Sequence, residues 1–412
     1  MPESPKSAIR RYLETQRAAQ VAFLADLVRQ PSDNPPGDCA PHGARAAELL
    51  EGLGFAVERH SVPEAECRAV GMLSAVNLIV RRRFGPGPTV ALNAHGDVVP
   101  PGEGWTADPY GAEVRDGVMY GRGVAVSKSD FATYAFALRA LEALDVPLAG
   151  AVELHFTYDE EAGGAIGPKW LLDNELTGPD FALSAGFSYS VVTAHNGCLH
   201  LEVELRGRSA HAARPDTGHD ALEAAAAVLA ALYAERARYS EIRSQVAGIE
   251  SPTLVVGLIE GGINTNVVPD RVRLRLDRRM IPEEDPETVE HRLRDLIARA
   301  SDPFAGVSVA VRRILLAEPL TPRAGVERLV EPLCANARAV FGVPVEVHGS
   351  PLYTDARHYA AAGVPTVLYG AGPRDLLEAN AHRADERLRL DDLAKATEVV
   401  ALTLADLLGA DD

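Results

Sequence analysis

The chain has 412 residues, of which 47% are hydrophobic and 24% charged, a composition typical of soluble globular proteins. Its 41 Lys and Arg residues against 58 Asp and Glu residues give a net charge of −17, so the surface repels phosphate and nucleic acid is not an expected partner. No apolar run approaches the roughly 20 residues that a membrane span needs, so no membrane association is expected.

The first 31 residues lack the uninterrupted apolar core of a signal peptide. Their large apolar residues recur at helical spacing and predict an amphipathic helix that lies on the body of the protein. These residues are Ile9, Leu13, Phe23, Leu24, Leu27 and Val28. The cysteines are far apart in the sequence and form no C-x-x-C pair: Cys39, Cys67, Cys198 and Cys334. This spacing predicts reduced thiols and a cytoplasmic location.

Apolar, β-rich runs alternate with alanine-rich helical stretches through the first half of the chain. Residues 88–97 and 151–158 predict strands, and residues 131–144 between them predict a buried helix. This order predicts an α/β fold with a mainly parallel sheet and helices on both faces. Such sheets bind ligands at the carboxyl ends of their strands. Two polar clusters follow the predicted strands there, His-Gly-Asp at 95–97 and Asp-Glu-Glu at 159–161.

The pattern changes near Asn196. Residues 199–205 and 271–276 alternate apolar and polar side chains, and residues 220–234 predict a helix. These elements predict a small antiparallel sheet with helices on one side. The buried-strand pattern resumes at residues 365–369. The sequence therefore predicts a discontinuous catalytic domain, residues 1–195 and 316–412, interrupted by a smaller α+β domain, residues 196–315.

Three places along the chain carry side chains suited to catalysis. His95 has a carboxylate, Asp97, two residues on, and metal-bound imidazoles need such a partner to fix their tautomer. Glu160 and Glu161 are adjacent acids at a strand end, where one can bind metal while the other moves protons. His382 follows a late glycine-rich loop. Taken singly, each of these also fits an ordinary surface loop.

In combination, the motifs are more specific than their parts. They run in order from about Asn77 to Glu386 and include NAHGDVVPPGEGW, YDEEAGG, GRSAHAARPDTG, GGINTNVVPDRVRLRLDRR and AHRADERL. The chain thereby resembles the dinuclear zinc aminoacylases and exopeptidases, a family that includes acetylornithine deacetylase, succinyl-diaminopimelate desuccinylase and carboxypeptidase G. The resemblance covers most of the chain.

The resemblance implies a role for each residue of the two strand-end clusters. His95 matches a ligand of the first metal and Asp97 the residue that orients it. Glu160 matches the general base that activates water. Glu161 and His382 match ligands of the second metal.

The resemblance also implies roles for the inserted domain, which would serve as a dimerisation or lid domain. His211 matches a histidine that supports the oxyanion in the partner subunit's active site, so a homodimer through this domain is expected. Asn266 and Arg279 match residues that hold the substrate's carboxylate, a task that suits a planar guanidinium. Arg278 is the competing assignment, because strand alternation sends the two arginines to opposite faces.

The sequence departs from the family at two metal-ligand positions. Gly121 to Gly123 and Lys128 fix the register of a run whose bridging aspartate is replaced by Val126. Asp130 lies about one helical turn, roughly 5–6 Å, further on and is too far for direct replacement. Gly186 stands where the family has a second acid, and His195 or Asn196 can be considered as substitutes.

A ligand count then leaves two possibilities open. One metal position keeps His95 alone and the other keeps Glu161 and His382, whereas a catalytic zinc normally has three protein ligands. Either one divalent metal (zinc, cobalt or manganese) is held by these three residues together, or no metal binds. Without a metal, burial and like-charge repulsion raise the pKa of one acid of the Glu160–Glu161 pair.

Three functions follow from these possibilities. The first is a metallopeptidase-family amidohydrolase of amino-acid metabolism, acting on a small carboxylate-bearing N-acyl amino acid or dipeptide. The second is a metal-independent racemase, epimerase or lyase that uses Glu160 for proton transfer. The third is an inactive binding protein, against which the retained base and histidines argue.

Overall fold

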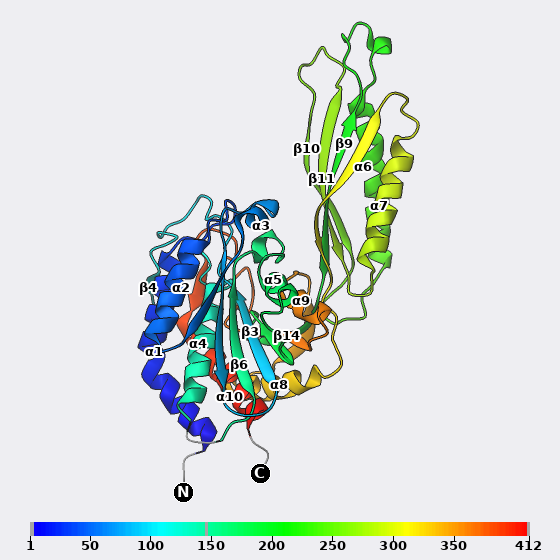
Figure 1. Ribbon diagram of the computed structural model, residues 1–412. Coiled ribbons are helices and arrows are strands. Elements are labelled where there is room, and N and C mark those ends of the chain that lie inside the picture. The colour runs from blue at the N-terminus through cyan, green and yellow to red at the C-terminus, as the bar shows by residue number, and fades with distance from the viewer. Residues whose placement is uncertain (1–3, 145–146, 410–412) are drawn as a thin grey trace. The chain divides into compact units, whose positions relative to one another are not determined.

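The computed structural model describes residues 4–144 and 147–409, which form two compact units (Figure 1). The first unit, termed the catalytic domain after the family resemblance, comprises Met1–Thr193, Pro322–His348 and Thr354–Asp412, and the second, termed the inserted domain, comprises Ala194–Thr321 and Gly349–Tyr353. The inserted unit is thus longer than the expected 196–315. Residues 349–353 join it because the Asn196 N–H donates to the Ser350 carbonyl at 3.0 Å and the Gly349 N–H donates to the Ala247 carbonyl at 2.7 Å.

The catalytic domain is built on an eight-stranded mixed sheet with the order β1-β2-β6-β3-β7-β14-β8-β13. The central strands β6, β3, β7 and β14 run parallel, while β2 runs antiparallel to β1 and β6, and β8 runs antiparallel to β14. The predicted mainly parallel sheet is therefore confirmed. Its strands are β1 (Val57–Ser61), β2 (Val76–Arg83), β3 (Thr89–His95), β6 (Ala151–Thr157), β7 (Phe181–Ser184), β8 (Ser190–His195), β13 (Glu346–Ser350) and β14 (Thr366–Leu368).

Helices cover both faces of this sheet. Val90 and Leu92 of β3 belong to the main core with α1, α4 and α10, whereas Ala91 between them packs with Ala182 and with Tyr359 of α9. This alternation explains why β3 is apolar throughout. The helices are α1 (Pro5–Arg29), α2 (Ala40–Gly52), α3 (Glu64–Ala69), α4 (Lys128–Glu142), α5 (Pro168–Asp173), α8 (Glu327–Phe341), α9 (Ala356–Ala361) and α10 (Leu390–Leu408). A small sheet, β15 (Arg387–Arg389), β5 (Val118–Tyr120) and β4 (Glu113–Arg115), completes the domain.

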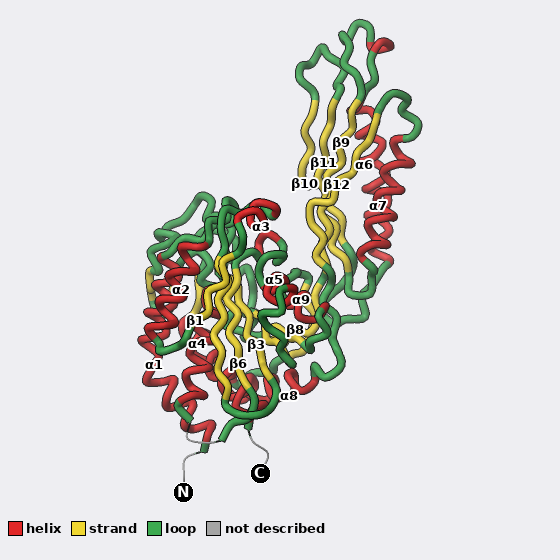
Figure 2. Tube along the Cα trace, viewed as in Figure 1, coloured by secondary structure: helices red, strands yellow, loops and turns green. Residues whose placement is uncertain are grey.

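The inserted domain is a four-stranded antiparallel sheet with the order β10-β11-β9-β12, and α6 and α7 pack on one face (Figure 2). Its elements are β9 (Gly197–Arg206), α6 (Ala221–Arg238), β10 (Thr253–Gly261), β11 (Arg271–Met280), α7 (Pro286–Ser301) and β12 (Ser308–Ala317). Val272, Leu274 and Leu276 of β11 are buried beneath the helices, as the alternation predicted. On the other face, Arg271 and Arg275 pair with glutamates of β9.

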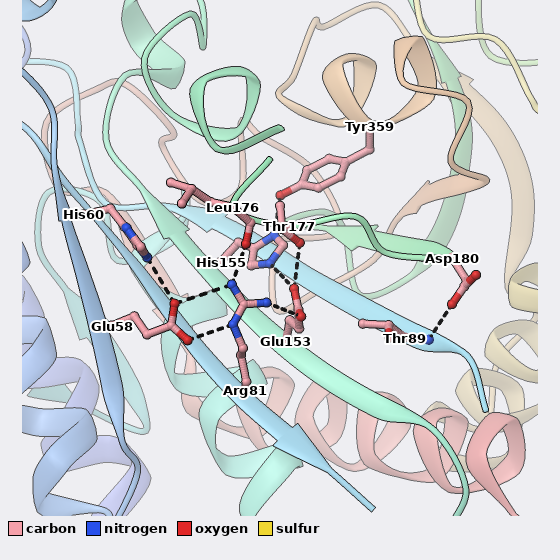
Figure 3. A network of polar contacts seen from close by, with 10 residues as sticks. All are labelled: Glu58, His60, Arg81, Thr89, Glu153, His155, Leu176, Thr177, Asp180 and Tyr359. Carbon is pink, nitrogen blue, oxygen red and sulfur yellow. Dashed lines mark hydrogen bonds and ion pairs between the residues drawn. The ribbon is translucent and has the colours of Figure 1, made fainter. Parts of the chain in front are cut away.

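A charged network crosses the edge of the large sheet (Figure 3). The Arg81 guanidinium lies between Glu58 of β1 and Glu153 of β6, and His155 bridges Glu153 to the Tyr359 hydroxyl at 2.8 Å. Burial alone raises the pKa of Glu153, but His155, Thr177 and Arg81 outweigh it and lower that pKa to about 2. The network thereby keeps a carboxylate ionised on a buried strand.

Within residues 4–144 and 147–409, no helix combines the length and the hydropathy required to cross a membrane. All four cysteines lie in this part of the chain, where they are buried and form no disulfide.

Candidate active site

His95 is the last residue of β3 and is almost fully buried. Its Nδ1 lies 3.0 Å from the Asp97 carbonyl oxygen and 3.4 Å from the Asp97 carboxylate. Because a carbonyl only accepts, Nδ1 carries the hydrogen and Nε2 keeps its lone pair in the neutral ring. Burial lowers the pKa of His95, but the contact with Asp97 and the charge of Glu160 outweigh it and raise that pKa well above its usual value.

The buried Asp97 carboxylate connects the ends of two neighbouring strands. It accepts hydrogen bonds from the Glu160 N–H at 3.3 Å and the Glu161 N–H at 3.1 Å, and from Asn34 Nδ2 at 3.0 Å. Asp97 therefore contacts His95 and also fixes the backbone that carries both acids. No sequence pattern predicted that Asp97 holds the backbone of Glu160 and Glu161.

Glu160 and Glu161 open a short 3₁₀ turn, Glu160–Ala162, which follows the end of β6 after two intervening residues. One ligand atom each from His95, Glu160 and Glu161 lie within 4.8 Å of one another, which is close enough to share a metal ion. Burial raises the pKa of Glu160 well above its usual value, the nearby Glu161 raises it further, and His95 opposes both.

His382 reaches this cluster through Glu161. Its Nε2 lies 3.3 Å from Glu161 Oε1, and that hydrogen bond raises the pKa of His382. Within the described ranges, the 4.8 Å grouping that includes His95 does not include His382. Glu161 is thus the common neighbour of the two histidines that the sequence assigned to metal binding.

The two departures from the family pattern have clear structural settings. Val126 packs against the hydrophobic core of the catalytic domain. A Cβ on Gly186 would lie 2.7 Å from the Tyr369 nitrogen and 2.8 Å from the Leu368 carbonyl carbon, so a carboxylate side chain has no room there. Neither of these two positions therefore offers a side-chain oxygen to a metal. The imidazole of His95, the Glu161 carboxylate and the imidazole of His382, which lies 3.3 Å from that carboxylate, are a donor set that one divalent ion accepts.

Asp130 and His195, which stand near the two lost ligand positions in the sequence, form hydrogen bonds with backbone groups. The Asp130 carboxylate accepts a hydrogen bond of 2.6 Å from the Ala371 N–H. His195 Nδ1 lies 2.9 Å from the Asn196 carbonyl oxygen and 3.3 Å from the Leu320 N–H, contacts internal to the inserted domain. Asp130 thus holds the segment after β14.

Asp130 is expected to make stability fall with rising pH. Burial, opposed by hydrogen bonds from Ala371 and Gly186, raises its pKa to about 7 from 3.8. The folded state keeps a proton that the unfolded state releases between these values, so stability decreases as pH rises towards 7. The asparagine side chain carries no ionisable proton, so the free energy of unfolding of Asp130→Asn should not fall in this way. Measured by urea unfolding, the stability of the variant relative to the wild type should rise between pH 4 and pH 8 by a few kcal/mol, on the order of 1.4 kcal/mol per pKa unit. A difference independent of pH would contradict this.

One acid of the site escaped the sequence analysis. Asp355 precedes α9, is buried, and has no hydrogen-bond partner at either carboxylate oxygen among the described residues. Its Oδ1 lies 2.2 Å from the place of a Cβ on Gly164, whose φ of +69° also favours glycine. Burial raises the pKa of Asp355 to about 6, against the charges of Arg357 and His95. Asp355 lies in TDARHYAAAGVPTVLYGAGP, a stretch that matches the family but that assigned this acid no role.

Two candidates of the inserted domain occupy adjoining loops. The Ala212 N–H donates to the Asn266 carbonyl at 3.0 Å, and His211 forms an isolated bridge with Val267. The Ala213 N–H donates to His211 Nδ1 at 3.0 Å, so Nε2 carries the hydrogen of the neutral ring. The exposed His211 is therefore a hydrogen-bond donor at Nε2.

The two adjacent arginines of β11 differ in their surroundings. The Arg278 side chain is 2% exposed, pairs with Glu284 and stacks on the Tyr239 ring at 4.3 Å. The Arg279 side chain is 31% exposed on the opposite face, with Nε 3.0 Å from Asp277 Oδ1. Arg278 is thus committed to the core of the inserted domain, whereas Arg279 is accessible to a ligand.

Comparison with known proteins identifies the family to which the chain belongs. Residues 91–406 match the family described as Peptidase family M20/M25/M40. The chain belongs to this family. The predicted recognition and hydrolase class are thereby confirmed: the protein is a hydrolase-type enzyme of the metallopeptidase class, and its family generally uses divalent metals.

Relatives align along nearly the whole chain. A succinyl-diaminopimelate desuccinylase of Rhizorhabdus wittichii is 30% identical, covering 90% of this chain and 94% of the relative. One from Acidiphilium cryptum is 28% identical, covering 93% and 96%. Among solved structures, an M20 family metallo-carboxypeptidase of Sulfolobus solfataricus has a TM-score of 0.77 at 18% identity, covering 93% of this chain and 98% of that one. Human carnosine dipeptidase 1 has a TM-score of 0.72 at 19% identity, covering 98% and 99%. The structures share the fold.

Proposed function

We propose that this M20 family protein is an amidohydrolase that cleaves a small, carboxylate-bearing N-acyl amino acid or dipeptide with the help of one divalent ion. The observation that carries this proposal is the convergence of His95, Glu160 and Glu161 within 4.8 Å at the strand ends. Relatives named succinyl-diaminopimelate desuccinylase, at 28–30% identity along nearly the whole chain, support an N-acyl amino acid as the substrate class.

In this proposal, His95 and Glu161 hold the ion (zinc, cobalt or manganese), with His382 as the third ligand through its place beside Glu161. When bound, the ion supplies Lewis-acid polarisation of the amide carbonyl. Glu160 accepts a proton from the attacking water and returns it to the leaving amine nitrogen. Asp97 holds the proton of His95 on Nδ1, so Nε2 stays available as a ligand atom.

Residues of the inserted domain are proposed to bind the rest of the substrate. Arg279, the exposed arginine of its pair, and Asn266 would hold the carboxylate. His211 would donate its Nε2 hydrogen to the oxyanion.

A homodimer through the inserted domain and a cytoplasmic location are also proposed. The edge strand β10 exposes Val255, Leu258 and Ile259 beside unpaired backbone groups, which suits pairing with a second copy. Light scattering should give twice the chain mass of 43.9 kDa; a monomer at micromolar concentration would contradict the dimer.

A second candidate is metal-free proton transfer, as in a racemase, epimerase or lyase. Val126 and Gly186 favour it, because each replaces a carboxylate that the family uses to hold metal. Here Glu160 would exchange a proton with carbon beside the substrate's carboxylate.

Metal content and activity, measured together, distinguish these candidates. The wild type should contain about one more ion per chain than the variant H95A/E161Q. Chelation should abolish hydrolysis of N-acyl amino acids and dipeptides, and the metal should restore it. If the two proteins contain equal amounts of metal, and the wild type still exchanges a substrate proton after chelation, the second candidate is correct and the hydrolase proposal is wrong.

A further inference from the structure

A second group of metal-ligating side chains lies in the inserted domain, on the sheet face opposite α6 and α7. Cys198 and His200 are two residues apart on β9 and therefore point to the same face. On the neighbouring strand β11, Asp277 pairs with His200 and Arg279 pairs with Cys198. The sheet register thus places a thiol, an imidazole, a carboxylate and a guanidinium at the corners of one square.

The three ligand atoms of this group converge. Cys198 Sγ lies 3.2 Å from His200 Nε2, His200 Nε2 lies 2.8 Å from Asp277 Oδ2, and Cys198 Sγ lies 3.6 Å from Asp277 Oδ2. A catalytic relay would need Asp277 and Cys198 on different nitrogens of the ring. Here both face the same nitrogen, Nε2. This geometry is that of a chelating group and not of a nucleophile with its base.

The spacing of these atoms is close to that of a tetrahedral metal site. Zinc bonds of about 2.3 Å to sulfur and 2.0–2.2 Å to nitrogen and oxygen give ligand–ligand separations of about 3.4–3.6 Å. The sulfur–oxygen distance already has this value, and the other two need to lengthen by only about 0.4–0.6 Å. The strand backbones can remain in place, because side-chain rotations supply such changes.

The charges of the surroundings also suit a divalent ion. A thiolate and the Asp277 carboxylate together neutralise two positive charges. Arg279 Nε, 3.0 Å away, holds Asp277 by its other oxygen, Oδ1, as outer hydrogen bonds do for metal-binding carboxylates. Cys198 is buried, while the His200 and Asp277 side chains are 34% and 29% exposed, so an ion has a path from solvent.

We propose that Cys198, His200 and Asp277 form a binding site for zinc or another thiophilic divalent metal in the inserted domain. The protein supplies three ligands, and the fourth position is open to water or to a small anionic ligand. No ligand of this site belongs to the His95 cluster, so the site does not depend on the catalytic ion, and Arg279, which holds Asp277, is the one residue that the two proposals share.

Cobalt substitution tests the site directly. Metal-stripped full-length protein, titrated with Co²⁺, should develop the near-ultraviolet charge-transfer absorption of a cobalt–thiolate bond, and in H95A/E161Q this absorption should saturate at one ion per chain. The band should persist in H95A/E161Q, because the catalytic cluster contains no thiol. Cys198→Ser should abolish it. Asp277→Asn should weaken Co²⁺ binding by more than the roughly 10–100-fold cost of losing an outer-shell partner.

Cys334→Ser is the matched control, since Cys334 is also buried but lies on α8. It should leave the band unchanged. In the H95A/E161Q background, which lacks the catalytic cluster, Zn²⁺ should raise the unfolding temperature, and adding Cys198→Ser to that background should abolish the rise, since only a folded site gains from binding. If Cys198→Ser fails to fold, His200→Gln serves the same purpose. A wild type without the thiolate band, or a Cys198→Ser protein that keeps it, overturns the proposal.

Discussion

Replacing Glu160 with glutamine is expected to lower kcat by about 10²–10⁴-fold. The glutamine amide has the shape of the carboxylate, and the backbone N–H of residue 160 still donates to Asp97. The amide cannot, however, take a proton from water. Since Glu160 is proposed as a base and not as a ligand, the metal content should not change. Steady-state kinetics with a hydrolysed N-acyl amino acid, together with elemental analysis, measure both quantities.

Glu161→Gln is the matched comparison, because it changes the neighbouring acid on the same turn. This variant should lose the ion, and excess metal should partly restore its activity, whereas excess metal should not rescue Glu160→Gln. A Glu160→Gln enzyme that keeps more than about a tenth of the wild-type kcat, or that loses its metal, would show that Glu160 has another role.

The fold was largely predictable because buried apolar residues recur along the sequence with the period of the helix or strand that contains them. The run at 88–97 became β3, buried on both faces, and the alternation at 271–276 became the two-faced strand β11. The predicted helix start at Asp220 is explained by its side chain, which accepts hydrogen bonds from the Leu222 and Glu223 N–H groups. The limits of the inserted domain were less predictable, since residues 349–353 join it through single backbone hydrogen bonds.

The active site was predictable only where side chains stand in family motifs. The contact of Asp97 with two backbone N–H groups depends on the meeting of two strand ends, which no local pattern records. Asp355 reaches the site by packing on Gly164, far away in sequence. The Cys198 cluster needs the register between β9 and β11. A search for cysteine pairs along the chain therefore could not reveal it.

The buried ion pair of Arg122 and Glu386 is expected to give the largest effect on stability. Arg122 Nη1 lies 2.6 Å from Glu386 Oε2, and both side chains are 1% exposed. Glu386 Oε1 accepts hydrogen bonds from the Ala125 N–H at 3.0 Å and the Val126 N–H at 3.3 Å. Arg122→Met leaves the glutamate buried without its cation, which should cost about 3–5 kcal/mol of unfolding free energy in urea.

The exposed pair of Arg59 and Glu51 is the control, with side chains 41% and 45% exposed at 2.7 Å. Arg59→Met should cost at most about 1 kcal/mol. If the two variants lose equal amounts of unfolding free energy, the buried pair contributes no more to stability than the exposed pair.

The cost of Arg122→Met should also depend on pH. Burial raises the pKa of Glu386 even with Arg122 beside it, so removal of the arginine raises that pKa further. The folded variant then holds a proton that the unfolded chain releases, and its stability relative to the wild type falls as pH rises above the ordinary glutamate value. At low pH the protonated Glu386 needs no cation and the deficit narrows. Unfolding curves at pH 5 and pH 8 measure this change, and a deficit that is constant across this range would mean that lost packing, and not the orphaned charge, destabilises the variant.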